Sequence, residues 1–168
     1  MNKKKTVIIT ETGTIPAANS YTLDLRRTEV KGCIGCWTCW WKTPGRCTFK
    51  DLDEFYHHYI TADRTIFFSQ VTRGFVSGRL KTLFDRIIPL YLPYTEYSTG
   101  ESMHVPRYEQ YPDIEFYYEG SFDTPAGRQI FVDYIQRVFY QFHSANTIVK
   151  PIEEYAAEGG GNSCKPSF

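Results

Sequence analysis

Four cysteines lie within fifteen residues of one another in the first third of the chain. They follow the pattern Cys-x2-Cys-x2-Cys-x7-Cys and are Cys33, Cys36, Cys39 and Cys47. Two intervening residues let neighbouring sulfur atoms turn toward a common centre, and Gly35 permits the backbone bend that this requires. Four thiolates can hold an iron–sulfur cluster or a tetrahedral zinc ion.

The spacing favours the cluster, with a [4Fe–4S] cluster as the first candidate, because zinc sites more often use two separated Cys-x2-Cys pairs. A packed loop of thiols without metal is the third possibility. Three tryptophans, Trp37, Trp40 and Trp41, lie among the cysteines. They could shield such a site from water or pack against a partner subunit.

Length and charge limit the classes of protein that the chain can belong to. Its 168 residues correspond to about one domain. Nineteen basic and nineteen acidic residues give a formal net charge of zero, which argues against nucleic-acid and polybasic membrane binding. The longest apolar run, residues 87–94, contains two prolines and is too short to cross a membrane. Clustered cysteines and the lack of a signal-peptide core lead us to expect a cytoplasmic protein.

The elements that must position the cysteines alternate between strand and helix. The pattern predicts strands over residues 6–10, 20–25, 65–69, 114–118 and 146–150. Helices are expected after Asp51, with Glu54 completing a capping box, after Ser77, and after Thr124. Asp85 and Arg86 are interpreted as an ion pair at a helix end, and residues 89–112 as a long, proline-containing loop.

This alternation predicts an α/β domain with a mainly parallel five-stranded sheet and helices on both faces. We expect residues 1–152 to form the domain and residues 153–168 a flexible tail. Ligands of such sheets bind beyond the carboxyl ends of the strands. The cysteine loop follows the second strand, and the turns at residues 70–74 and 119–123 follow the third and fourth. All three should therefore meet at that edge.

Residues 25–27, 31–39 and 45–47 resemble the iron–sulfur flavoprotein branch of the flavodoxin-like, NADPH-dependent FMN reductases. Residues 80–86 resemble the helix that follows the third strand in the same superfamily. The resemblance implies a flavodoxin-like three-layer sandwich, FMN as cofactor, and electron transfer with a nicotinamide donor. It also implies that the four cysteines are the cluster ligands. The candidate cofactor-binding residues after the third strand are Ser69, Gln70, Val71, Thr72, Arg73 and Gly74.

The chain departs from that family between its first two strands. Relatives carry a phosphate-binding loop and a whole helix there, but this chain has nine residues, from Glu11 to Asn19. Since a parallel crossover usually needs a dozen or more residues, we predict that the first two strands form an antiparallel hairpin or that the second leaves the sheet. The helix N-terminus that cradles a phosphate is then missing. The turn after the third strand also lacks the aromatic residue that relatives place against the flavin.

Two functional hypotheses follow. The first is an oxidoreductase or electron-transfer protein with FMN, an iron–sulfur cluster, or both. The second is a family member without flavin that acts as a binding or assembly subunit. Loss of a covering helix would expose one sheet face, and the tryptophans and the tyrosine-rich segment 89–120 supply interface anchors. We therefore expect a homodimer or larger homo-oligomer, or a complex with a full-length paralogue that carries the intact phosphate loop.

Overall fold

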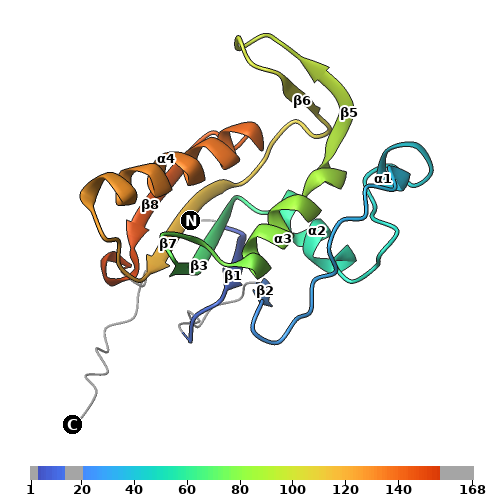
Figure 1. Cartoon of the computed structure of the whole chain (residues 1–168). Coiled ribbons are helices and arrows are strands. Elements are labelled where there is room, and N and C mark those ends of the chain that lie inside the picture. The colour runs from blue at the N-terminus through green and yellow to red at the C-terminus, as the bar shows by residue number, and fades with distance from the viewer. Residues whose placement is uncertain (1–3, 14–20, 156–168) are drawn as a thin grey trace.

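The computed structural model describes residues 4–13 and 21–155, and a parallel β-sheet forms its centre (Figure 1). Five strands pair in parallel in the order β2-β1-β3-β7-β8. They are β1 (Thr6–Thr10), β2 (Tyr21–Asp24), β3 (Arg64–Thr72), β7 (Asp113–Glu119) and β8 (Thr147–Pro151). Numbered among themselves, these strands follow the order 2-1-3-4-5, which is that of the flavodoxin-like doubly wound fold. The predicted α/β class and mainly parallel five-stranded sheet are confirmed.

The pairing of β1 with β2 corrects the sequence prediction. Val7 lies opposite Tyr21 and Thr10 opposite Asp24, in parallel register, so the expected antiparallel hairpin is wrong. The prediction treated a helix as necessary for a parallel return. A five-residue strand covers only about 17 Å, whereas ten extended residues can span about 33 Å. Residues 11–20 are therefore long enough to bring the chain back without a helix.

Four α-helices accompany the sheet in the described residues: α1 (Thr38–Trp41), α2 (Asp53–Ile60), α3 (Gly78–Arg86) and α4 (Pro125–Gln141). The two predicted caps at Ser77 and Thr124 are confirmed, because each side chain accepts a backbone N–H three residues on, at 3.1 and 3.0 Å. Asp51 is not a cap. Helix α2 has Leu52 at its N-cap position without a side-chain hydrogen bond, and the Asp51 carboxylate pairs with Arg86 instead.

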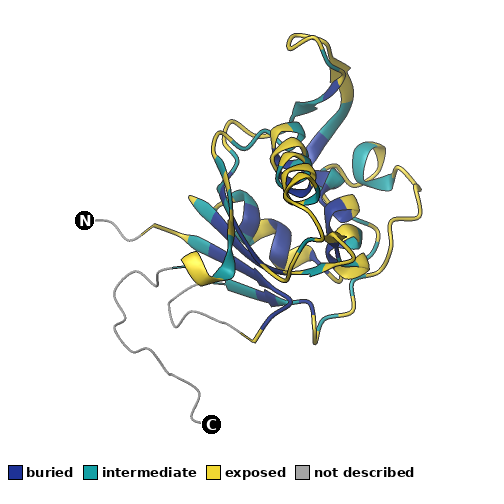
Figure 2. Cartoon of the chain, turned by 60° about the vertical axis from the view of Figure 1, so that its left-hand side comes forward, coloured by how far each residue is buried: buried dark blue, intermediate teal, exposed yellow. Residues whose placement is uncertain are grey.

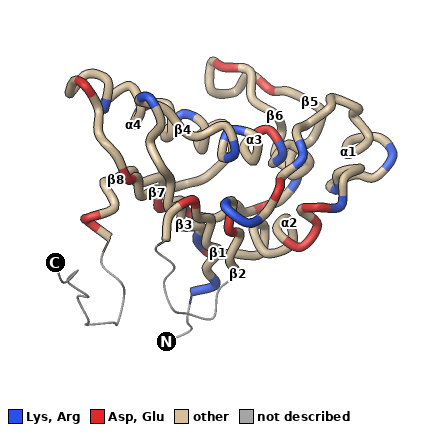
Figure 3. The backbone as a smooth tube through the Cα atoms, turned by 60° about the horizontal axis from the view of Figure 1, so that its bottom comes forward, with Lys and Arg blue, Asp and Glu red and all other residues tan. Residues whose placement is uncertain are grey.

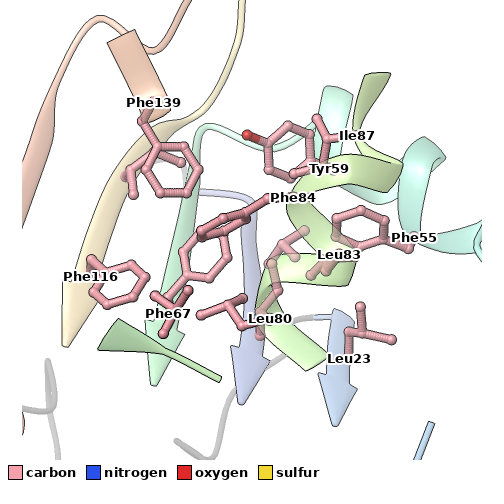
Figure 4. Close-up of a cluster of buried hydrophobic side chains, with 14 of the residues drawn as sticks. Leu23, Phe55, Tyr59, Phe67, Leu80, Leu83, Phe84, Ile87, Phe116 and Phe139 are labelled. Carbon is pink, nitrogen blue, oxygen red and sulfur yellow. The ribbon is translucent and has the colours of Figure 1, made fainter. Parts of the chain in front are cut away.

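The main core lies between one face of the sheet and helices α2, α3 and α4 (Figure 4). Phe67 of β3 is its centre. Its ring stacks on Phe116 of β7 with centroids 5.5 Å apart and contacts Phe139 of α4 at 5.1 Å. Leu83 of α3 is fully buried in the same cluster. These apolar side chains fix α3 against the middle of the sheet.

The opposite face of the sheet carries a smaller apolar cluster of Ile8, Ile66, Phe68 and Tyr117. In the described residues, two side chains pack against this cluster. They are Ile152, in the short 3-10 helix η2 (Ile152–Glu154), and Tyr155. The side view shows the helical ribbons on the other side of the buried strands (Figure 2). In the described part of the chain, the α-helices expected on both faces of the sheet are thus found packed against one.

Residues 89–112, predicted as a loop, contain a β-hairpin that projects from the body of the molecule (Figure 1). A 3-10 turn, η1 (Ile88–Leu90), leads into β5 (Tyr91–Glu96), which pairs antiparallel with β6 (Met103–Pro106). Prolines concealed these strands from the sequence pattern. They are tolerated because a two-stranded ribbon has only edge strands, on which a missing N–H can face outward.

The predicted turn after the third strand is mostly strand. Ser69 to Thr72 complete β3, which then folds back on β4 (Phe75–Val76). Arg73 and Gly74 form the tight connection with φ values of 52° and 76°. Left-handed residues at both central positions are typical of a two-residue hairpin turn.

Charged residues of both signs are interspersed along the chain (Figure 3). Among the described residues, no helix is long and apolar enough to cross a membrane. The predicted flexible tail is described only as far as Tyr155. Residues 156–168, with Cys164, lie outside the described residues.

Candidate functional site

Helix α3 links two candidate sites, one at each of its ends. It starts after the β3–β4 hairpin, beside the carboxyl ends of the strands, and its nine residues span about 13 Å. Ser77 caps its first turn and Arg86 is its last residue. We call the region around Glu11 and Ser77 the carboxyl-edge site and the region around the four cysteines and Arg86 the cysteine pocket.

The four cysteines line one pocket, whose other walls come from residues 34, 37, 48–49, 86 and 88–89. The predicted convergence of the thiols is therefore seen, while their role as metal ligands stays a prediction. Their predicted position is wrong. The pocket lies against the end of α3 and against η1, at the opposite end of the helix from the carboxyl edge. The loop after β2 is long enough to carry the cysteines back along the sheet.

Three left-handed residues shape the cysteine loop. Gly35 and Gly45 have φ values of 64° and 80°, and Trp37, which precedes the one-turn helix α1, has a φ of 60°. Glycine adopts this conformation without steric cost, so Gly35 provides the bend that the sequence predicted. The four cysteines are free thiols.

The thiols are near enough to influence one another's ionisation. Burial raises the pKa of Cys39, and the charges of Cys47, Cys36 and Cys33 raise it further. Hydrogen bonding from Thr38 lowers the pKa of the exposed Cys36. The lowered pKa of Cys36 and the raised pKa of Cys39 mean that Cys36 becomes a thiolate at lower pH than Cys39.

No group of three or more His, Cys, Asp or Glu side chains in the described part of the chain is arranged to hold a metal ion. The pocket itself has a volume of about 30 Å³. Four thiols that line one pocket are the donor set of either a zinc ion or an iron–sulfur cluster, and both stay predictions.

Arg86 gives a second indication of a ligand in the pocket. Its side chain is 1% exposed and forms two hydrogen bonds with Asp51, at 2.6 and 3.1 Å, while Nη1 also donates to the carbonyl of Lys31. Its Nε is buried and has no partner among the described residues. Buried N–H groups are rarely left unpaired, so this one favours an acceptor that occupies the pocket. The predicted Asp85–Arg86 pair is wrong, since Asp85 instead binds Lys81 at 2.5 Å.

Exposed apolar side chains lie in the cysteine loop. Ile34 and Trp37, which line the pocket, are 66% and 63% exposed, and Trp41 of the same loop is 72% exposed. Trp40 is half-buried, and its indole N–H donates to the Tyr91 carbonyl at 3.0 Å, which ties the cysteine loop to the base of the hairpin. Trp40 therefore has a structural role, whereas the other three side chains are available to a partner.

The carboxyl-edge site is a cavity of about 630 Å³ that Glu11, Arg26, Gln70, Ser77 and residues 78–79 help to line. The Glu11 carboxylate is 7% exposed. It accepts hydrogen bonds from the Ser69 hydroxyl at 3.0 Å, the Gln70 N–H at 3.3 Å and the Ser77 hydroxyl. The carboxylate thus occupies three hydrogen-bond donors of this edge, while two arginines, Arg26 and Arg79, line the same cavity.

The predicted cofactor-binding segment is divided between these surroundings. Ser69 and Gln70 lie at the carboxyl-edge site, Val71 and Thr72 pair with β4, and Arg73 and Gly74 form the exposed turn. The sequence prediction missed Glu11 and the Asp51–Arg86 pair. An acidic residue directly after the first strand, where relatives carry a phosphate loop, was the available signal for the former. A larger cavity of about 1080 Å³, at the amino edge near Lys5, Asp63 and Asp113, lies apart from both sites.

The strand order and the helices on α3's side define a flavodoxin-like α/β protein, and the expected resemblance is confirmed at the level of fold. No protein-family model matches the chain. An iron–sulfur flavoprotein of Methanocaldococcus jannaschii is 38% identical over 60 residues, which cover 36% of this chain and 30% of that protein. The match thus spans less than a third of the relative's length.

Solved structures of azoreductases have the same fold. The chain superposes on azoreductase AzrA with a TM-score of 0.56 and 12% identity, covering 87% of each chain. It superposes on an azoreductase of Bacillus anthracis strain Sterne with a TM-score of 0.57 and 12% identity, covering 88% of this chain and 87% of that chain. It superposes on an FMN-dependent NADH-azoreductase of B. anthracis strain Ames Ancestor in complex with FMN with a TM-score of 0.55 and 12% identity, covering 88% of this chain and 86% of that chain.

Proposed function

We propose that this chain is an electron-transfer component of a flavodoxin-like oxidoreductase and that the cysteine pocket holds an iron–sulfur cluster of the [4Fe–4S] type. The observation that supports this most directly is the convergence of Cys33, Cys36, Cys39 and Cys47 on one pocket with a buried, unpaired arginine N–H in its wall. Such a cluster, when bound, takes up and releases single electrons. The chain supplies the four thiolates, an arginine in the wall and apolar side chains at the mouth.

FMN enters the proposal as the cofactor of a partner. One structural neighbour is FMN-dependent and was solved with FMN, which supports a flavin in proteins of this fold. In this chain, however, Glu11 uses the donors at the carboxyl edge. We therefore propose that FMN, with a nicotinamide as electron donor, is held by a full-length relative that carries the phosphate loop. The exposed Ile34, Trp37 and Trp41 would form the surface that meets this partner beside the cluster.

The test is to express the chain anaerobically, alone and together with a full-length relative, and to measure iron, sulfide and flavin. We expect about four iron and four sulfide per chain, as in a [4Fe–4S] cluster, and a visible absorbance that bleaches on reduction. Flavin should accompany the chain only in the co-expressed complex. Absence of iron and sulfide from anaerobic protein would contradict the cluster, and flavin bound to the isolated chain would contradict its assignment to the partner.

The second candidate function is a flavin-free assembly subunit, which the Glu11 carboxylate at the carboxyl edge favours. Under this alternative the cysteine pocket is structural, and the complex forms without iron. Light scattering of the isolated chain at micromolar concentration tests the homodimer expected from the sequence. A complex with the relative that is equally stable with and without iron would favour the assembly role over electron transfer.

A further inference from the structure

The cysteine pocket has one charged wall residue. Among the described residues that line it, the four cysteines are accompanied by Thr48 and by apolar side chains, and Arg86 is the only one with a fixed charge. Any group held by four thiolates is anionic, and a neighbouring charge acts more strongly inside a protein than in water. The guanidinium of Arg86 is therefore the dominant charge that the protein itself directs at such a group.

The guanidinium is held in place from several directions. Asp51 binds it through both carboxylate oxygens, the Lys31 carbonyl accepts from Nη1, and its Cζ lies 5.4 Å from the centre of the Phe49 ring. Arg86 also ends α3, where the helix dipole favours a positive charge. Burial lowers its pKa, but the hydrogen bonds to Asp51 and the nearby charges of Tyr56 and Cys47 raise it above its usual range.

These contacts occupy Nη1 and Nη2 and leave Nε–H, which is buried and unpaired in the described structure. A purely structural ion pair would place all of its N–H groups on acceptors, because an unpaired buried donor is costly. We propose that Arg86 sets the reduction potential of the group in the cysteine pocket, by presenting a fixed positive charge and a free N–H to its sulfur atoms. This inference rests on the proposed iron–sulfur cluster.

The expected effect has a definite sign. Reduction of a cluster adds one electron and breaks no bond, so the reduced form carries one more negative charge than the oxidised form. A buried cation stabilises the reduced form and raises the potential, and hydrogen bonds to cluster sulfurs act in the same direction. The carboxylate of Asp51, beside the guanidinium, opposes this effect. Removing Arg86 should lower the potential, and removing the charge of Asp51 should raise it.

The experiment measures the midpoint potential of the anaerobically purified full chain by redox titration followed by absorbance, together with iron and sulfide content. For Arg86→Gln we expect at least about a tenfold lower ratio of reduced to oxidised cluster at a fixed potential, which corresponds to about 59 mV for one electron. Asp51→Asn should move the ratio in the opposite direction. Lys81→Gln is the matched control, since it removes one positive charge from an exposed side chain of the same helix and should leave the ratio nearly unchanged.

If Arg86→Gln does not fold, because Asp51 is left without its partner, the opposite shift in Asp51→Asn still tests the inference, and so does the charge-neutral double variant. Normal iron content with unchanged potentials in both single variants would show that Arg86 is only structural. Wild-type protein without iron and sulfide would instead overturn the proposed cluster and this inference with it. The iron analysis and the potential thus separate the two failures.

Discussion

The two ends of α3 hold opposite kinds of site. At its start, the Glu11 carboxylate accepts hydrogen bonds from Ser69, Gln70 and Ser77. At its end, the positive Arg86 lines a pocket of four thiols and keeps one N–H unpaired. One end is thus satisfied internally, and the other has unused binding capacity.

This contrast shows that the two candidate sites depend on different segments of the chain. The carboxyl-edge site is built from Glu11 after β1 and from the start of α3, whereas the cysteine pocket is built from the loop after β2 and from the end of α3. The parallel pairing of β1 with β2 preserves the sheet that holds α3 in position.

The largest effect should come from the ligands themselves. We expect Cys39→Ser/Cys47→Ser to lose nearly all iron and sulfide, because the remaining two thiolates cannot complete a four-cysteine ligand set. Iron and sulfide analysis of anaerobic protein checks this. Cys164→Ser is the control and should keep its iron, since the proposed ligand set does not include Cys164. Full iron content in the double variant would show that the pocket is not the site.

Loosening the helix between the two sites should affect both. Leu83 is fully buried on α3, and Leu83→Ala should lower the free energy of unfolding by about 2–5 kcal/mol through the lost burial and the cavity left behind. Urea denaturation measures this, with the exposed Lys81→Ala as control, for which we expect a change of about 0.5 kcal/mol or less. A similar small change at Leu83 would mean that α3 is not anchored by the core.

Neutralising Glu11 should make the two ends more alike. Glu11→Gln weakens charge-assisted hydrogen bonds to Ser69, Gln70 and Ser77, and we expect stability to fall by about 1–3 kcal/mol. Because the edge also loses its anion, the variant should bind inorganic phosphate more tightly than the wild type, as followed by isothermal titration. Thr12→Ser, in the same segment, serves as control. Weaker phosphate binding in Glu11→Gln would contradict the view that the carboxylate excludes an anion.

The smallest effect concerns pH at the carboxyl edge. Hydrogen bonding from Arg26 lowers the pKa of Asp24, so the folded state favours the carboxylate. The resulting stabilisation is present above the unfolded pKa of about 3.9 and is lost as the pH falls through the lower folded value. The stability difference between wild type and Asp24→Asn, measured by denaturation at several pH values, should therefore be present at pH 7 and shrink below about pH 4. A difference that grows toward acid would reverse the assignment.

The sequence predicted the positions of strands and helices better than the direction of strand pairing and the contacts between distant residues. The strands from Thr6, Thr65, Ile114 and Asn146 could be found because runs of apolar and β-branched residues depend on local burial alone. The caps at Ser77 and Thr124 are equally local. By contrast, the residues around Asp51 match the pattern of a helix N-cap, but its carboxylate pairs with the buried Arg86. The two residues are 35 positions apart in the sequence, so no local pattern reveals the pair. The parallel direction of β2 was missed because the number of residues between two strands limits how far apart they can lie but does not fix whether they run parallel or antiparallel.

The candidate site was predictable in the same measure. The cysteine spacing identified which residues converge, because two-residue gaps and Gly35 restrict the loop locally. It could not show that the loop runs back to the end of α3, since that depends on Trp40 meeting the hairpin at Tyr91. The hairpin itself was hidden by Pro93 and Pro106.

The placement of the tryptophans has a practical consequence. All three tryptophans of the chain lie in the cysteine loop, at positions 37, 40 and 41, and none is in the main core. Intrinsic fluorescence excited in the indole band therefore reports on this loop almost alone. Loading of the pocket can be followed optically without any label, and circular dichroism follows global unfolding independently of this loop, because the main core contains phenylalanine and tyrosine but no tryptophan.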